Sequence, residues 1–66
     1  MIYLDIPADE LDDAADVIAS RTSVVPYASY PHPDQPDFHR MEFELRVNMN
    51  IVKTALDRAN IETFVA

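Results

Sequence analysis

The sequence predicts an α+β fold in which a four-stranded antiparallel sheet carries two helices on one face. Segments with alternating apolar and polar residues indicate strands, and two longer segments with apolar residues three and four apart indicate amphipathic helices. These segments follow one another in the order strand, helix, strand, strand, helix, strand. The chain has 66 residues and no internal repeat or linker-like segment, so a single compact domain over residues 1–66 is expected.

The N-terminal third predicts the first strand and the first helix. Residues 2–6 alternate apolar and polar side chains, and Pro7 ends the strand and suits the first turn of a helix. Asp9 and Asp12 are expected to form a capping pair, and the helix is expected to stop in the Thr22–Ser23 pair. The residues expected to face the core are Leu11, Ala14, Ala15 and Ile18.

The middle of the chain predicts two strands joined by a stiff loop. Residues 23–30 favour an extended strand, and Pro26 within them requires an edge position or a bulge because proline has no N–H to donate. Residues 31–37 contain three prolines and predict an extended loop. The next strand is expected over His39–Val47, with one apolar face made of Met41, Phe43, Leu45 and Val47.

The C-terminal third predicts the second helix and the last strand. Asn48 or Asn50 is expected to cap the helix, and Asn60 is a suitable stop in a chain without glycine. Residues 61–65 then predict a short strand. The apolar positions of the helix, spaced i, i+3, i+4 and i+7, are Val52, Ala55, Leu56 and Ala59.

This order of elements corresponds to a ferredoxin-like βαββαβ arrangement, in which the first and third strands are central and the other two form the edges. Pro26 then falls on an edge strand, where its missing N–H is tolerated. One sheet face is expected to pack against the helices and the other to face solvent. The residues expected on the open face are Tyr3, Asp5, Glu42, Glu44, Arg46 and Glu62, with Tyr27 or Phe64.

Composition narrows the possible functions. The absence of cysteine excludes a disulfide and a thiolate nucleophile, and the absence of glycine excludes the common phosphate-binding loops. Twelve acidic residues against five basic ones give a net charge of -7, which disfavours nucleic acid and anionic membranes as ligands and favours a basic partner. No apolar run approaches the ~20 residues of a membrane span and no signal peptide is recognised, so a cytoplasmic protein is expected.

Acidic residues are concentrated at the N-terminus, where six of the first sixteen residues are carboxylates and none is basic. Asp9, Asp12, Asp13 and Asp16 are spaced i, i+3, i+4 and i+7, so they share one side of the predicted helix. Like charges at this spacing repel one another, and that cost favours a surface for binding Arg and Lys side chains. Hydration of an exposed helix face, or adaptation to high salt, explains the same pattern. The expected partner-binding residues are Asp5, Asp9, Glu10, Asp12, Asp13, Asp16, Glu42 and Glu44.

Other chemistry is less well supported by the sequence. His32 and His39 flank two aspartates across the proline loop and could hold a metal, but their spacing matches no recurring site, so no metal or cofactor is expected. Catalysis is not expected either, because so small a domain offers no cleft in which a carboxyl group could be desolvated. Stacking of RNA bases on sheet aromatics is disfavoured by the carboxylates expected on the open face.

In size, acidity, lack of glycine and cysteine, and its Asp9/Asp12/Asp13/Asp16 row, the chain resembles the small phage-encoded anti-CRISPR proteins that inhibit type I (Cascade) complexes, several of which imitate DNA. The resemblance implies a non-catalytic inhibitor that binds a basic Cas subunit and blocks target DNA. We expect a monomer in the host cytoplasm. The basic residues Arg40, Arg46, Lys53 and Arg58 depart from a pure mimic, so the DNA-like patch is expected on the first helix.

A second hypothesis is a small regulatory or assembly module that self-associates through a sheet edge or through the open sheet face. In that case the acidic residues confer only solubility, and the aromatic side chains carry the interaction. The residues expected to matter are Tyr3, Tyr27, Tyr30 and Phe64.

Overall fold

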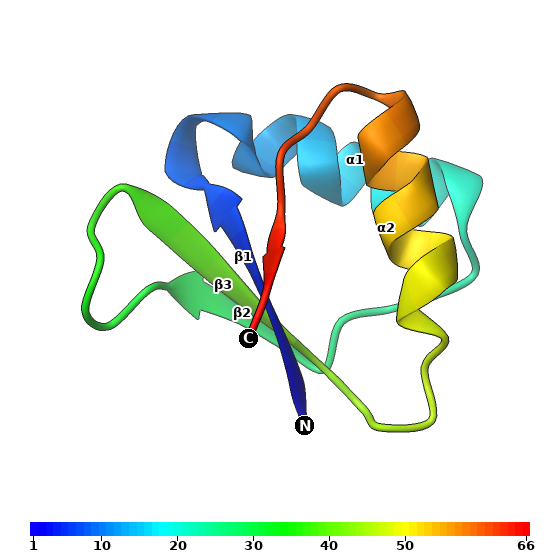
Figure 1. Ribbon diagram of the computed structural model, residues 1–66, viewed down its shortest axis with the longest axis horizontal. Coiled ribbons are helices and arrows are strands. Elements are labelled where there is room, and N and C mark those ends of the chain that lie inside the picture. The colour runs from blue at the N-terminus through cyan, green and yellow to red at the C-terminus, as the bar shows by residue number, and fades with distance from the viewer.

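The computed structural model describes residues 1–66 as four strands, two α-helices and a short 3-10 helix (Figure 1). The α+β class predicted from the sequence is confirmed. In chain order the elements are β1 (Ile2–Pro7), the 3-10 helix η1 (Ala8–Glu10), α1 (Leu11–Arg21), β2 (Ala28–Pro31), β3 (Phe38–Phe43), α2 (Met49–Arg58) and β4 (Phe64–Val65).

The four strands form one antiparallel sheet in the order β2-β3-β1-β4. Strands β1 and β3 are therefore central and β2 and β4 are edges, as predicted. Figure 1 shows the hairpin loop between β2 and β3 at the left and the two helices next to each other at the top. Residues directly opposite in an antiparallel sheet share a face, so the register brings Tyr30, Arg40, Asp5 and Phe64 into one row across all four strands.

The core lies between one sheet face and both helices. Alternate residues of β1 and β3 point into it, which confirms the predicted apolar faces of these strands up to Phe43. Each helix contributes a stripe of residues three and four apart. The buried residues are Leu4, Ile6, Ala14, Val17, Ile18, Met41, Phe43, Val52, Ala55, Leu56 and Ile61.

Strand β3 is shorter than predicted. It ends at Phe43, which pairs with Ile2. Because Ile2 is the first residue of β1, no residue of β1 lies opposite the chain beyond Phe43. Residues 44–47 instead form a turn closed by a hydrogen bond of 3.0 Å from the Val47 N–H to the Glu44 carbonyl oxygen. The prediction that Leu45 belongs to the core face is wrong, because 76% of its surface is exposed.

The edge strands are also shorter than predicted. Strand β2 begins at Ala28 and not at residue 23, so Pro26 lies before the strand and Pro31 is its last residue. Strand β4 comprises only Phe64 and Val65, because Ile61 is used to end α2 and is buried in the core.

Helix α2 begins and ends as predicted. The Asn48 side chain caps its N-terminus by accepting a 3.1 Å hydrogen bond from the Asn50 N–H. Asn60 has a φ of 60°, a left-handed conformation that asparagine tolerates better than most residues. The N–H groups of Asn60 and Ile61 donate to the carbonyl oxygens of Asp57 and Leu56, both at 3.0 Å, which is the Schellman arrangement.

Helix α1 ends at Arg21 as predicted, but its start and its buried face differ from the prediction. Neither η1 nor α1 has a side-chain cap, so the expected capping pair of Asp9 and Asp12 is wrong. The chain enters the helix through a 3-10 turn whose first N–H, from Ala8, donates to the Asp37 carbonyl oxygen at 2.8 Å. The prediction that Ala15 faces the core is wrong, because Ala15 is exposed. Val17, which was not predicted to face the core, is buried.

Candidate functional site

The four aspartates Asp9, Asp12, Asp13 and Asp16 are all exposed on η1 and α1, and we call them the acidic ridge. The three ion pairs of the protein involve other residues, so no cation of the same chain neutralises the ridge. Glu10 precedes α1, is half-buried and makes no capping hydrogen bond. The ridge is therefore a set of exposed carboxylates without ion-pair partners that can bind cationic groups, with three of them on α1 and Asp9 on the 3-10 turn before it.

Position along α1 separates the members of the ridge. Asp12 and Asp13 lie in the first turn, where a negative charge is stabilised by the helix dipole. Asp16 lies one turn further on, where that stabilisation has largely faded. At about 100° per residue, Asp12 and Asp16 lie within about 40° of each other on the most exposed side of the helix, and Asp13 is turned toward one flank.

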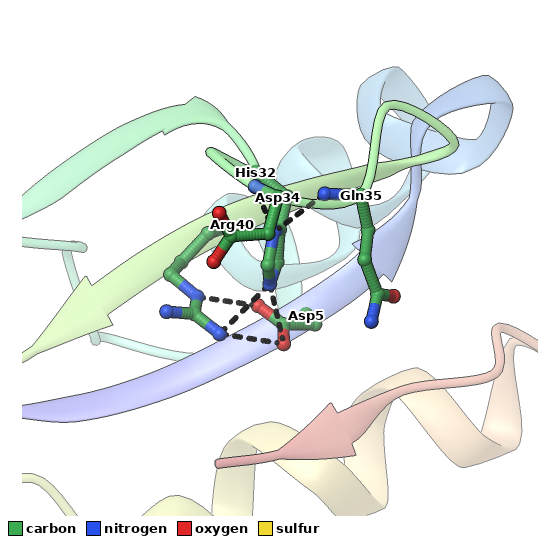
Figure 2. Close-up of polar contacts among 5 residues, drawn as sticks. All are labelled: Asp5, His32, Asp34, Gln35 and Arg40. Atoms are coloured by element: carbon green, nitrogen blue, oxygen red, sulfur yellow. Dashed lines mark hydrogen bonds and ion pairs between the residues drawn. The ribbon is translucent and has the colours of Figure 1, made fainter.

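Asp5 does not extend this row. It lies on the open sheet face, where Arg40 Nε and Nη2 donate to its two carboxylate oxygens at 2.8 and 3.0 Å (Figure 2). The hydrogen bonds from Arg40 hold the pKa of Asp5 below its usual value, and Asp5 in turn raises the pKa of Arg40. The guanidinium also lies over the Tyr3 ring, 4.9 Å from its centroid. The charge of Asp5 is therefore neutralised within the chain.

His32 fixes the proline loop over this ion pair. Its Nδ1 accepts hydrogen bonds from the backbone N–H groups of Asp34 and Gln35, both at 3.0 Å (Figure 2). Nε2 lies 2.9 Å from Arg40 Nη2 and 3.6 Å from Asp5 Oδ2, and only 7% of the His32 side chain is exposed. The imidazole thus has a structural role.

The two remaining predicted acids lie in different places. Glu42 lies on the open sheet face as predicted, opposite Tyr3, and the interaction of the Tyr30 hydroxyl with its carboxylate raises the pKa of Tyr30. Glu44 was expected on the same face, but it lies in the turn after β3 and pairs with Arg46 at 3.0 Å. Its place there follows from the early end of β3.

His32 and His39 do not converge. His39 pairs with Ile6 in the sheet and therefore points to the helix side, where its Nε2 lies 2.7 Å from Ser29 Oγ, whereas His32 joins Asp5 and Arg40 on the open face. No group of three His, Asp or Glu side chains is placed to hold a metal ion. The metal-dependent alternative thus gains no support from this geometry.

Sequence reasoning missed the network that joins Asp5, Arg40, His32 and Tyr3. The available signal was the alternation of the two strands, which puts Asp5 and Arg40 on the solvent side of β1 and β3. Recognising them as a pair requires the register between the strands, which the sequence pattern does not give. The edge-to-face contact of Phe38 and Phe64, with ring centroids 5.8 Å apart, is a second feature of this face that needs the register.

Fold and site together describe a small α+β domain, with a Cα radius of gyration of 10.6 Å, that carries an unpaired acidic ridge on its helical layer and internally paired charges on its sheet. Comparison of the chain with protein-family models, curated proteins and solved structures gives no match. Neither helix has the length and apolar character needed to cross a membrane.

Proposed function

We propose that this protein is a non-catalytic inhibitor that binds the nucleic-acid-binding surface of a basic protein. The expected target is a Cas subunit of a type I Cascade complex in the cytoplasm of a phage-infected cell. One observation carries the proposal. The acidic ridge is exposed and has no cation of its own chain beside it, whereas Asp5 and Glu44 are each paired with an arginine.

Binding is electrostatic in this proposal. A helix rises about 6 Å over four residues, which is comparable to the spacing of neighbouring phosphates along a nucleic-acid strand. Carboxylates at this spacing occupy Arg and Lys side chains that otherwise hold target DNA. Counterions released from both surfaces favour the complex, so the affinity falls as the salt concentration rises.

The test compares two fourfold variants of equal charge with purified Cascade. In the ridge variant, Asp9, Asp12, Asp13 and Asp16 become Asn. In the control variant, four exposed acids outside the ridge lose their charges as D34N, D57N, D37N and E62Q. The readouts are the affinity for Cascade by calorimetry and the inhibition of target-DNA binding by fluorescence anisotropy, with circular dichroism to check the fold.

The ridge variant is expected to lose the interaction and the control variant to keep most of it. If each charge pair contributes about 0.5–1 kcal/mol, four pairs correspond to an affinity loss of about 30- to 1000-fold. Each single Asp→Asn change removes one such pair and is expected to weaken the binding only about 2- to 5-fold. Inhibition by the ridge variant at the wild-type level would reject the proposal. Equal losses of affinity in both variants would show that the ridge acts only through the net charge of the protein.

Self-association through the sheet is the second candidate function. It is favoured by β4, an edge strand of two residues in which Phe64 and Val65 are 47% and 49% exposed. Sedimentation at low and high salt separates the two candidates. Dimerisation through this edge becomes tighter as the salt concentration rises, because screening weakens the repulsion between two chains of charge -7. Binding to a basic partner instead becomes weaker as the salt concentration rises.

A further inference from the structure

An apolar groove of about 320 Å³ runs along the flank of α1. Ala15 and Ala19 of α1 form one wall, and Val25 and Pro26 of the connection to β2 form the other. Met41, which is buried in the core, lies at its floor. Six of the nine lining residues are hydrophobic, so the groove favours an apolar group over a polar one.

The groove is open because no element covers this flank of α1. Helix α2 packs against α1, but none of its residues lines the groove. The wall formed by Val25 and Pro26 faces solvent, and 81% of the surface of Val25 is exposed. Val25 extends the apolar lining of the groove into solvent, and contiguous exposed apolar surface is a feature of binding sites.

None of the lining residues is acidic, but two aspartates of the acidic ridge neighbour the groove alanines around α1. Asp12 and Asp16 each precede a groove alanine by three residues, so each lies about 60° around the helix from that alanine. Asp13 is turned more than about 100° away from both alanines. Asp12 and Asp16 therefore lie on the groove side of the ridge, within reach of a partner seated in the groove, and Asp13 lies on the other side.

Charge selects the occupant. A second copy of this chain would bring another acidic surface against the rim, and an anionic lipid headgroup would be repelled in the same way. We infer that the groove receives an apolar side chain of a basic partner while neighbouring Arg or Lys side chains of that partner pair with Asp12 and Asp16. This inference rests on the proposed function and narrows it, because the partner then presents an apolar residue among its cations.

The test uses isotopically labelled protein and two synthetic helical peptides of equal positive charge. One carries Arg and Lys with leucines spaced to form an apolar stripe, and in the other serine replaces every leucine. Burying one leucine side chain corresponds to about 10- to 100-fold in affinity. The leucine peptide is expected to bind tighter by this factor and to shift the NMR signals of Ala15, Ala19 and Val25. Equal affinities, with shifts confined to the ridge, would overturn the inference and leave the proposed function intact.

Two sets of variants sharpen the result. Val25→Ser changes an exposed residue. It is expected to lower the affinity for the leucine peptide and to leave the affinity for the serine peptide unchanged. The double variant Asp12→Asn/Asp16→Asn is expected to lower the affinity for the leucine peptide by about 5- to 30-fold, which corresponds to the loss of two charge pairs. Asp9→Asn with Asp13→Asn removes the same charge away from the groove and is expected to have a smaller effect. Equal losses in the two double variants would overturn the inference, and binding of neither peptide by the wild type would overturn the proposed function too.

Discussion

Replacing Asp5 by Asn tests the ion pair that organises the open sheet face. Asn keeps the shape of the side chain but offers Arg40 one acceptor oxygen and no charge. In the wild type Arg40 donates to both oxygens at 2.8 and 3.0 Å, and 14% of the Asp5 side chain is exposed. A hydrogen bond to a charged group contributes about 1.5–3 kcal/mol to stability, and solvent screening at the sheet surface lowers the expected loss to about 1–2 kcal/mol.

The same ion pair makes stability depend on pH. Because the hydrogen bonds from Arg40 lower the pKa of Asp5 below its usual 3.8, the folded protein binds this proton more weakly than the unfolded chain does. The contribution of the pair is therefore fully present above pH 3.8 and is lost as the pH falls through the lower folded-state pKa. The Asp5→Asn variant lacks this contribution at every pH. The difference in the free energy of unfolding between the variant and the wild type should therefore shrink in acid.

Urea unfolding followed by circular dichroism, at neutral pH and in acid, measures both effects. Asp5→Asn should unfold at lower urea concentration at neutral pH, while its affinity for the proposed target, Cascade, should match that of the wild type per folded molecule. Asp37→Asn is the control, since Asp37 is exposed in the proline loop and forms no ion pair. Wild-type stability of Asp5→Asn at neutral pH, or a deficit that persists in acid, would refute the reasoning.

Three further predictions concern local structure and are checked by thermal or urea unfolding. Asn60→Ala should lower stability by about 1 kcal/mol because alanine resists the left-handed φ of 60°, whereas Asn60→Gly should match or exceed the wild type. Asn48→Ala should cost about 1 kcal/mol, because the Asn50 N–H loses its side-chain acceptor. Arg46→Ala should leave the unfolding midpoint unchanged, since the side chains of the Glu44–Arg46 pair are 47% and 82% exposed.

The parts of the fold predicted correctly are those with local signals. Helix α2 has a side-chain cap at Asn48, an apolar stripe of period 3.6 and a left-handed stop at Asn60, all encoded within thirteen residues of one another. The alternation in β1 and β3 likewise identified the core faces of both strands. In these elements the sequence pattern and the tertiary environment agree, so the prediction needs no knowledge of neighbouring elements.

The errors arise where a neighbouring element decides the outcome. Alternation continues through Leu45, but a strand also needs a partner, and β1 pairs only as far as Ile2 opposite Phe43. The carboxylate of Asp5 looks available in the sequence because its partner, Arg40, is 35 residues away. The groove beside Ala15 depends on which flank of α1 is left open by α2, and helical periodicity within α1 carries no information about that.

Asp16 separates a recognition surface from a hydrated helix face. It lies beyond the first turn, so the helix dipole does not explain it, and it is three and four residues from Asp13 and Asp12. Asp16→Ala removes these two repulsions, about 0.2–0.5 kcal/mol each, and replaces a poor helix former by the best one, about 0.6 kcal/mol. The variant should therefore unfold at a higher temperature than the wild type.

The same Asp16→Ala change should weaken binding to the proposed target, Cascade, by about 2- to 5-fold, and the loss of affinity should diminish at high salt because a charge pair has been lost. Asp16→Asn removes the charge without the gain in helix propensity, so it should show the same loss of affinity with a smaller gain in stability. Natural proteins carry destabilising residues with and without a functional benefit, so the paired measurements of stability and affinity decide which case applies to Asp16. If Asp16→Ala is more stable and binds as tightly as the wild type, the aspartate serves hydration alone and the acidic ridge is not a binding surface.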